Sequence, residues 1–305
     1  MDDQIDCLVV GGGPAGLTAA IYLARFHLSV RLVDAGKSRM AAIPRTHNHA
    51  GYPGGVPGVD LLERMREQAR EFGVVSETGV AEHVERAQDL FVARLASGEA
   101  IRARTLLLAT GIVNRPPSIS PELHDVALAR GLIRYCPICD GFEVTDKRVG
   151  VIGDGSHGCK EAVFLRSYTR DVTLIAPHGP LDAPEPDRGR AQDIGVHMVD
   201  GPCEPLRLDG DHIVVPTPAG DLMFDTIYPA LGSVIRSELA VALGADASPD
   251  GCLVVDTHQR TSIPGLYAAG DLVKGLDQIS HAMGEGGVAA TTIRNDLAEA
   301  APFCR

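Results

Sequence analysis

A strand-like segment, a glycine-rich turn and a helix-like segment follow one another near the start of this chain. Residues 5–10 are mostly apolar, the turn reads GGGPAG at 11–16, and residues 17–26 are rich in Ala and Leu. A second apolar strand at 30–33 ends in Asp34, which stands 23 positions after the first glycine of the turn. This is the pattern of a dinucleotide-binding βαβ unit. Its glycines let the backbone approach a pyrophosphate at the helix N-terminus, and its acid binds a ribose.

The same pattern occurs a second time near the middle of the chain. A strand-like segment at 148–152 leads into the turn GDGSHG at 153–158, and a helix-like segment at 160–168 and a strand at 172–175 follow. The second turn begins 142 positions after the first, and Ala176 stands 142 positions after the acid of the first copy. The repeat therefore indicates two α/β units built on one plan, the second without the ribose-binding carboxylate.

Two further segments complete each unit. Each copy later reaches an apolar strand that runs into a glycine, LLLATG at 106–111 and IYPALG at 227–232. The turn-prone sequence NRPP at 114–117 separates the copies, and 232–237 is the expected return crossing. Residues 251–297 contain a strand and a helix but no nucleotide turn, so we expect them to fold back onto the first unit.

The sequence thus predicts an α/β fold with two Rossmann-like (three-layer ββα) dinucleotide-binding domains, the second inserted in the first. The first domain is expected at 1–114 and 237–305 and the inserted domain at 115–236.

Composition excludes several classes of function. The net charge of -12 has the wrong sign for a phosphate-binding surface, and the 4% of aromatic residues, without Trp, offers few platforms for stacking bases. No nucleic-acid partner is therefore expected. No run of about 18 apolar residues occurs, so no membrane span is expected either. Residues 1–10 show no basic leader, which predicts a cytoplasmic location.

Two of the seven cysteines form the only informative cysteine spacing. Cys136 and Cys139 are three residues apart, whereas the others are scattered singly. A zinc site would need a second Cys/His pair at ligand spacing, and the sequence has none, so no metal is expected. A disulfide between these two closes a small ring that a thiolate reopens readily, which favours a redox role over incidental burial.

These motifs together resemble the low-molecular-weight thioredoxin reductase family over nearly the whole chain. The resemblance rests on five segments in the family's order, which are GGGPAG at 11–16, LLLATG at 106–111, CPICD at 136–140, the glycine turn at 153–158 and GLYAAGD at 265–271. It implies a homodimer in which each subunit has an FAD-binding domain, split around a nicotinamide-type domain that carries the dithiol.

The resemblance also implies which residues bind and react. It gives Cys139 the position facing the flavin, Cys136 the exchange with the external partner, and Asp140 the transfer of a proton during thiol–disulfide exchange. The residues expected to bind FAD are Gly11, Gly12, Gly13, Pro14, Ala15, Gly16, Asp34, Ala35, Asn48, Thr110, Gly111, Gly270, Asp271, Gln278 and Ile279.

The second nucleotide site departs from the family. Thioredoxin reductases present arginines to the NADPH 2′-phosphate just after the second strand of this unit, but residues 176–185 contain no Arg or Lys. Ala176 cannot bind a ribose hydroxyl as a carboxylate would, and Asp154 adds negative charge inside the turn. The sequence therefore predicts weak or absent use of NADPH and NADH, with electrons arriving by another route as the alternative.

The dithiol segment also departs from the thioredoxin reductase family. Pro137 follows the first cysteine, as in relatives that oxidise small dithiols with oxygen. Those relatives often have His at the position of Asp140, so the acid here favours a reductase. The leading hypothesis is an FAD-dependent disulfide reductase that acts on a thioredoxin-like protein. The alternatives are an oxidase that forms disulfides in small thiols, and a flavin-bound redox sensor or interaction protein.

Overall fold

The structure is a computed structural model that describes residues 4–303. By contacts between Cα atoms it divides into two units. Unit 1 contains the chain up to Ala41, Val56–Val113 and the chain from Ile235 onward, and unit 2 contains Ala42–Gly55 and Asn114–Val234. The loop at 42–55 groups with unit 2, although the sequence analysis placed it with the first segment.

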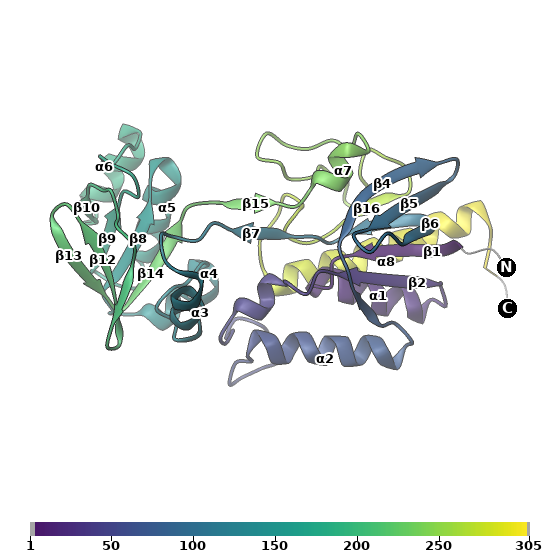
Figure 1. The fold of residues 1–305 in the computed structure, drawn as a ribbon, viewed down its shortest axis with the longest axis horizontal. Coiled ribbons are helices and arrows are strands. Elements are labelled where there is room, and N and C mark those ends of the chain that lie inside the picture. The colour runs from purple at the N-terminus through teal and green to yellow at the C-terminus, as the bar shows by residue number, and fades with distance from the viewer. Residues whose placement is uncertain (1–3, 304–305) are drawn as a thin grey trace. The chain divides into compact units, whose positions relative to one another are not determined.

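Unit 1 is built on a seven-stranded sheet in the order β3-β2-β1-β6-β5-β4, with β16 paired to β6 (Figure 1). Strands β1, β2, β3, β6 and β16 pair in parallel, and β4 and β5 add an antiparallel edge. The strands are β1 (Gln4–Val10), β2 (Val30–Asp34), β3 (Ser76–Thr78), β4 (Ala81–Ala87), β5 (Leu90–Leu95), β6 (Ala100–Leu108) and β16 (Leu266–Ala268).

The helices of unit 1 are α1 (Pro14–Arg25), α2 (Gly58–Glu71), α7 (Glu238–Ala242) and α8 (Ile279–Ala300), with a 3-10 turn at Arg39–Ala42. Helices α1 and α8 pack side by side (Figure 1). One core cluster joins the strands to the C-terminal part of the chain, from Leu8 and Leu106 to Leu253 and Leu272. The expectation that the C-terminal part folds back onto the first unit is confirmed.

Unit 2 repeats the plan with a parallel sheet in the order β10-β9-β8-β14 and a separate antiparallel sheet β11-β12-β13. Its strands are β8 (Val149–Gly153), β9 (Val172–Ile175), β10 (His197–Val199), β11 (Arg207–Asp209), β12 (His212–Thr217), β13 (Gly220–Phe224) and β14 (Thr226–Ala230). Its helices are α3 (Pro121–Ala129), α4 (Pro137–Asp140), α5 (Gly155–Leu165) and α6 (Glu185–Asp193), with a 3-10 turn at Gly141–Val144. The chain passes between the units through β7 (Ile112–Asn114) and β15 (Ser233–Ile235), which pair with each other.

The strand orders of the two units confirm the predicted duplication. β8, β9, β10 and β14 stand in the order of β1, β2, β3 and β6, and in both units these strands are parallel. The expected α/β fold with two Rossmann-like units is therefore correct. One boundary differs, since α5 starts at Gly155, five residues before the predicted start at 160.

Each unit brings the N-terminus of its first helix against the end of its first strand through two glycines. A Cβ on Gly16 would lie 1.9 Å from the carbonyl oxygen of Gly11, and a Cβ on Gly158 would lie 2.9 Å from the carbonyl carbon of Gly153. Side chains cannot fit at such distances, so glycine at these positions fixes the distance between strand and helix.

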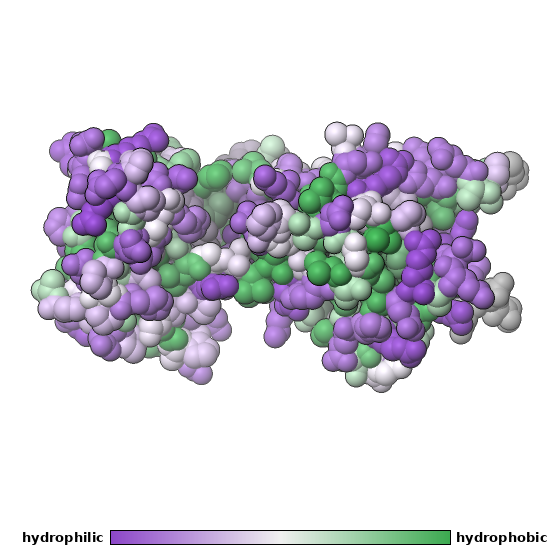
Figure 2. All heavy atoms as spheres, turned by 90° about the horizontal axis from the view of Figure 1, so that it is seen from above, coloured by the Kyte–Doolittle hydropathy of each residue, from purple (hydrophilic) through white to green (hydrophobic). Residues whose placement is uncertain are grey.

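Hydrophilic residues predominate on the face drawn in Figure 2, and the apolar residues on it form smaller patches. Within residues 4–303, no helix is both long and apolar enough to cross a membrane.

The packing of α8 on α1 gives a test of this fold. Gly286 lies where an added Cβ would meet the carbonyl oxygen of Ala15 at 2.3 Å, whereas Gly284, one residue before Glu285 on the same helix, has open space. We expect Gly286→Ala to lower the free energy of unfolding by about 1–3 kcal/mol through overpacking. Gly284→Ala should raise it by roughly 0.5–1 kcal/mol, because alanine is the better helix former.

Urea unfolding of the two variants measures this difference. Equal stability of both variants would show that α8 does not pack on α1 at Gly286.

Candidate active site and nucleotide sites

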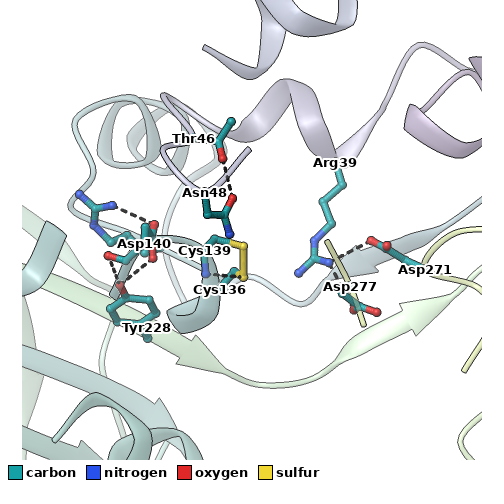
Figure 3. The surroundings of a disulfide bond; sticks show 10 residues. Arg39, Thr46, Asn48, Cys136, Cys139, Asp140, Tyr228, Asp271 and Asp277 are labelled. Carbon is teal, nitrogen blue, oxygen red and sulfur yellow. Dashed lines mark hydrogen bonds and ion pairs between the residues drawn. A yellow bond between two sulfur atoms is a disulfide. The ribbon is translucent and has the colours of Figure 1, made fainter. Parts of the chain in front are cut away.

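The two cysteines of the CPIC segment form a disulfide at the start of α4 (Figure 3). Their Cα atoms are 5.2 Å apart, within the usual range for a disulfide. Sγ of Cys136 accepts a hydrogen bond from the backbone N–H of Cys139 at 3.2 Å, so the first cysteine caps the short helix. Pro137 suits the first helical position because its missing N–H would have no partner there. Both cysteines are partly buried, and Ile138 between them is exposed.

The carboxylate of Asp140, the last residue of α4, is held by two side chains. Its Oδ2 accepts a hydrogen bond from the Arg134 guanidinium at 2.8 Å, and its Oδ1 accepts one from the Tyr228 hydroxyl at 2.7 Å (Figure 3). Tyr228 lies on β14 and is fully buried. The sequence analysis did not find either partner, and no local pattern indicates them, because Arg134 lies in a loop and Tyr228 is 88 residues away.

These contacts set the acidity of Asp140. Burial raises the pKa of this carboxyl, while the Arg134 charge and the hydrogen bonds from Tyr228 and Arg134 act in the opposite direction. Burial and the neighbouring carboxylate also raise the pKa of Tyr228, so its hydroxyl stays protonated and donates. The result is a carboxyl next to the disulfide with an increased affinity for a proton.

The first glycine turn presents backbone atoms, and no side chain, at the N-terminus of α1, because its residues there are glycines. Gly11 has a φ of +111°, and a Cβ there would meet the carbonyl oxygen of Ala109 at 2.2 Å. A Cβ on Gly12 would meet the Asp34 carboxylate at 2.7 Å, so the acid lies against the turn. At Gly13 the protein itself leaves room for a Cβ, with the nearest atom, Oγ of Ser38, 3.4 Å away.

This turn fits the pyrophosphate and ribose of FAD. Helix α1 has no side-chain cap at Gly13, which leaves its first backbone N–H groups for an anion. The Asp34 carboxylate is buried beside the turn, and the Arg66 guanidinium lies 3.4 Å from it. A bound FAD would therefore place its pyrophosphate on Gly11–Gly16 and a ribose near Asp34.

The predicted flavin contacts near the C-terminal part of unit 1 belong to a charged cluster. The Asp271 carboxylate pairs with the Arg39 guanidinium at 3.0 Å, and Arg39 also lies 3.3 Å from Asp277 (Figure 3). The backbone N–H of Gly270 donates to the Glu285 carboxylate at 2.7 Å. Arg39, Asp277 and Glu285 were missed, since each is a single charged residue without a motif.

The other predicted FAD residues lie at the ends of elements. Pro14 and Ala15 begin α1, Ala35 follows β2, and Gln278 and Ile279 cap and begin α8. Thr110 and Gly111 follow β6, and the Thr110 hydroxyl donates to the carbonyl of Arg236. Asn48 lies in the part of the loop that groups with unit 2 and accepts a hydrogen bond from Thr46. Their contacts with FAD stay predictions.

The second glycine turn differs from the first because a side chain caps it. Oδ1 of Asp154 accepts hydrogen bonds from the backbone N–H of Gly155 and of Asp182, each at 2.9 Å. The Gly155 N–H also lies 2.7 Å from the carbonyl oxygen of Asp182. The carboxylate therefore stands at the N-terminus of α5, where a pyrophosphate would bind in a unit of this kind.

The segment after β9 folds against this turn. Besides Asp182, its residue Leu181 accepts a hydrogen bond from the Arg188 guanidinium at 3.3 Å. Arg188 lies on α6, and this hydrogen bond directs its guanidinium to a backbone carbonyl of the segment. Ala176, at the position equivalent to Asp34, is fully buried.

Similarity to known proteins agrees with this geometry. A family model described as pyridine nucleotide-disulphide oxidoreductase matches residues 5–286. A thioredoxin reductase of Peptoclostridium litorale is 30% identical over 318 residues, which cover 98% of this chain and 99% of that protein. A bifunctional thioredoxin reductase/thioredoxin of Mycobacterium leprae is 34% identical over 307 residues, covering 96% of this chain and 66% of that protein. The crystal structure of a thioredoxin reductase from Streptococcus pyogenes superimposes with a TM-score of 0.89 at 27% identity, covering 98% of this chain and 100% of that one.

The chain therefore belongs to the pyridine nucleotide-disulphide oxidoreductases. Within that class it is a member of the thioredoxin reductase family, and it is an FAD-dependent thiol-disulfide oxidoreductase.

The hydrogen bond from Tyr228 gives a prediction for Asp140. Removing it with Tyr228→Phe should raise the pKa of Asp140 by about one to two units, because a hydrogen bond to a charged group contributes about 1.5–3 kcal/mol. Carbon-13 NMR of protein labelled at the aspartate carboxyls measures the titration, with Asp140→Asn assigning the signal.

Tyr135→Phe is the matched control, since that hydroxyl pairs with His124 in the same unit. The Asp140 titration should not move in it. An unchanged or lowered Asp140 midpoint in Tyr228→Phe would contradict the assignment.

Proposed function

We propose that this protein is a disulfide reductase that passes electrons through FAD and the Cys136/Cys139 dithiol to a thioredoxin-like protein, and that it uses NADPH weakly or not at all. The observation that carries the proposal is the disulfide with a partly buried carboxyl directly after it, which Arg134 and Tyr228 hold in place. The thioredoxin reductases to which the chain is similar support the partner class. A homodimer and a cytoplasmic location remain part of the same proposal.

The chemistry at the dithiol is an exchange of two electrons and two protons. Bound FAD would supply the electrons that convert the disulfide to two thiols. The Cys136 thiolate then attacks the partner disulfide, and the Cys139 thiolate displaces the reduced partner as the internal disulfide re-forms. Asp140 takes a proton when a thiol must attack and returns it to a thiolate that leaves, which suits a carboxyl with increased proton affinity.

Weak nicotinamide use is supported by the contrast between the two glycine turns. The first turn has an uncapped helix N-terminus, and the second has the Asp154 carboxylate bound to it. A pyrophosphate would have to displace a carboxylate of the same sign that already satisfies two backbone donors. The 2′-phosphate of NADPH would in addition find no Arg or Lys in residues 176–185.

A dithiol oxidase is the second candidate. The capped second turn favours it, because a protein without a nicotinamide donor could draw electrons from small dithiols and pass them to oxygen. Oxygen consumption with dithiothreitol distinguishes the two directions. A redox sensor, the third hypothesis, predicts no turnover with any donor.

Single cysteine variants test the proposed use of the dithiol. With chemically reduced protein, wild type should reduce a thioredoxin disulfide stoichiometrically, while Cys136→Ser and Cys139→Ser should each lose this by at least about a hundredfold, since neither can complete the exchange. Cys136→Ser should show a pH-sensitive long-wavelength absorption shoulder, and Cys139→Ser should not. The shoulder in the second variant would reverse the assignment of the two thiols.

Replacing the capping carboxylate tests the nicotinamide proposal. Asp154→Gly removes a charge from the turn and frees the Asp182 N–H, while the Gly155 N–H keeps its bond to the Asp182 carbonyl. We therefore expect affinity for NADH to rise by at least about tenfold, corresponding to one charge-assisted hydrogen bond. Anaerobic flavin bleaching by NADH and NADPH measures it. Asp182→Asn is the control, because Asp182 contributes only its backbone to the turn. Rapid bleaching of the wild type by micromolar NADPH would refute weak use.

A further inference from the structure

Glu161 on α5 is a second buried carboxyl in the neighbourhood of Asp140, and neither the motifs nor the proposed mechanism uses it. Its side chain is only 12% exposed. Among residues 4–303, its Oε1 is buried without a hydrogen-bond partner. A buried carboxylate that accepts no hydrogen bond at one oxygen is unfavourable, so the protonated form is preferred.

The surroundings of Glu161 add to this preference. Helix α4, which carries Asp140, packs against α5. Burial first, and then the charge of Asp140, raise the pKa of Glu161 to about 7. The two carboxyls therefore compete for protons, and Asp140 holds its negative charge more easily because Arg134 and Tyr228 are bound to it.

The other elements packed on α5 contribute few titratable groups near Glu161. Strands β8 and β9 carry none, and β14 contributes Tyr228. Asp187 and Arg188 of α6 act on Cys159, which is two residues before Glu161 and therefore on the opposite side of α5. The 3-10 turn after α4 carries Glu143, whose charge acts on Asp140. On its own helix, Nε2 of His157 lies 3.7 Å from Oε2 of Glu161, and the His157 side chain is 65% exposed.

We propose that Glu161 is a positioning residue for Asp140. Glu161 stores a proton beside the dithiol, and once it is ionised its charge keeps Asp140 able to protonate a leaving thiolate. The inference rests on the proposed role of Asp140. With Glu161 neutral, the proton affinity of Asp140 is set by its burial, by Arg134 and Tyr228, and by the charge of Glu143 in the following 3-10 turn. Once Glu161 is ionised, its charge increases the proton affinity of Asp140, so the proton donor survives to higher pH.

The test is the pH dependence of disulfide opening by dithiothreitol. One thiolate of the reagent attacks the Cys136–Cys139 bond, and the protein thiolate that leaves takes a proton from Asp140. The second thiol of the reagent then releases the other cysteine and closes oxidised dithiothreitol, so electrons and protons balance. Anaerobic quenching with N-ethylmaleimide and mass spectrometry of the dithiol peptide give the rate, which is divided by the concentration of reagent thiolate.

We expect wild type and Glu161→Gln to have equal normalised rates below about pH 5.5. Glu161 has a pKa of about 7 beside a charged Asp140, and one pKa unit of coupling is about tenfold. The wild-type profile should therefore flatten between about pH 6 and pH 7, and above about pH 8 it should fall in parallel with the Glu161→Gln profile, which is about tenfold lower there. Glu161→Met, neutral and of similar volume, should show the same shift. Glu185→Gln, an exposed carboxylate of the same unit, should follow wild type.

Two further readouts separate the possible failures. Infrared difference spectra between pH 6 and pH 8 should contain a protonated-carboxyl band that Glu161→Gln lacks. If Asp140→Asn leaves the opening rate unchanged at all pH values, the proposed role of Asp140 is wrong. If Asp140→Asn slows opening but the profiles of both Glu161 variants coincide with wild type, the inference about Glu161 alone is overturned. A uniform loss of rate at every pH would also overturn it, because that indicates only a structural role.

Discussion

The contact that only glycine permits between the first strand and the first helix determines both units of this protein. Gly16 faces the carbonyl of Gly11, and Gly158 faces Gly153, at distances that no side chain allows. Because the helix must begin so close to the strand end, its N-terminal N–H groups converge above the carboxyl edge of the parallel sheet. What each unit can bind then depends on which group meets those donors.

The two units have the same strand order, but they differ in the group that meets the N-terminus of the first helix. At the first turn no side chain caps α1, and the acid stands at the end of β2, buried against Gly12. At the second turn the acid has moved into the turn itself, where Asp154 caps α5, and the end of β9 is followed by a buried alanine. A carboxylate at the strand end suits a ribose hydroxyl, whereas a carboxylate at the helix N-terminus stands where an anion is favoured. The two units thus differ in where one negative charge lies.

Elements that depend on the order of residues along the chain could be predicted from the sequence. Residues whose role depends on contacts between distant elements were missed. The repeat at a fixed spacing predicted both parallel sheets, and the glycine turns predicted the ends of β1 and β8. The start of α5 was placed too late because a glycine-rich segment has low helix propensity, although the Asp154 cap makes it helical. Arg134, Tyr228 and Glu161 could not be found in the sequence, because Arg134 and Tyr228 meet Asp140, and α5 with Glu161 meets α4, only in the folded unit.

Helix α5 shows how a nucleotide-binding plan can serve a dithiol. At its N-terminus the Asp154 carboxylate accepts the Gly155 N–H of the helix and the N–H of Asp182, so a negative charge already stands there. About two turns further along, it places a nearly buried carboxyl within the electrostatic reach of Asp140. Reducing a disulfide consumes protons as well as electrons, and a buried carboxyl that titrates near neutrality is a local source of them. In this unit the helix that would hold a nucleotide therefore contributes the Glu161 carboxyl to the proton balance of Cys136 and Cys139.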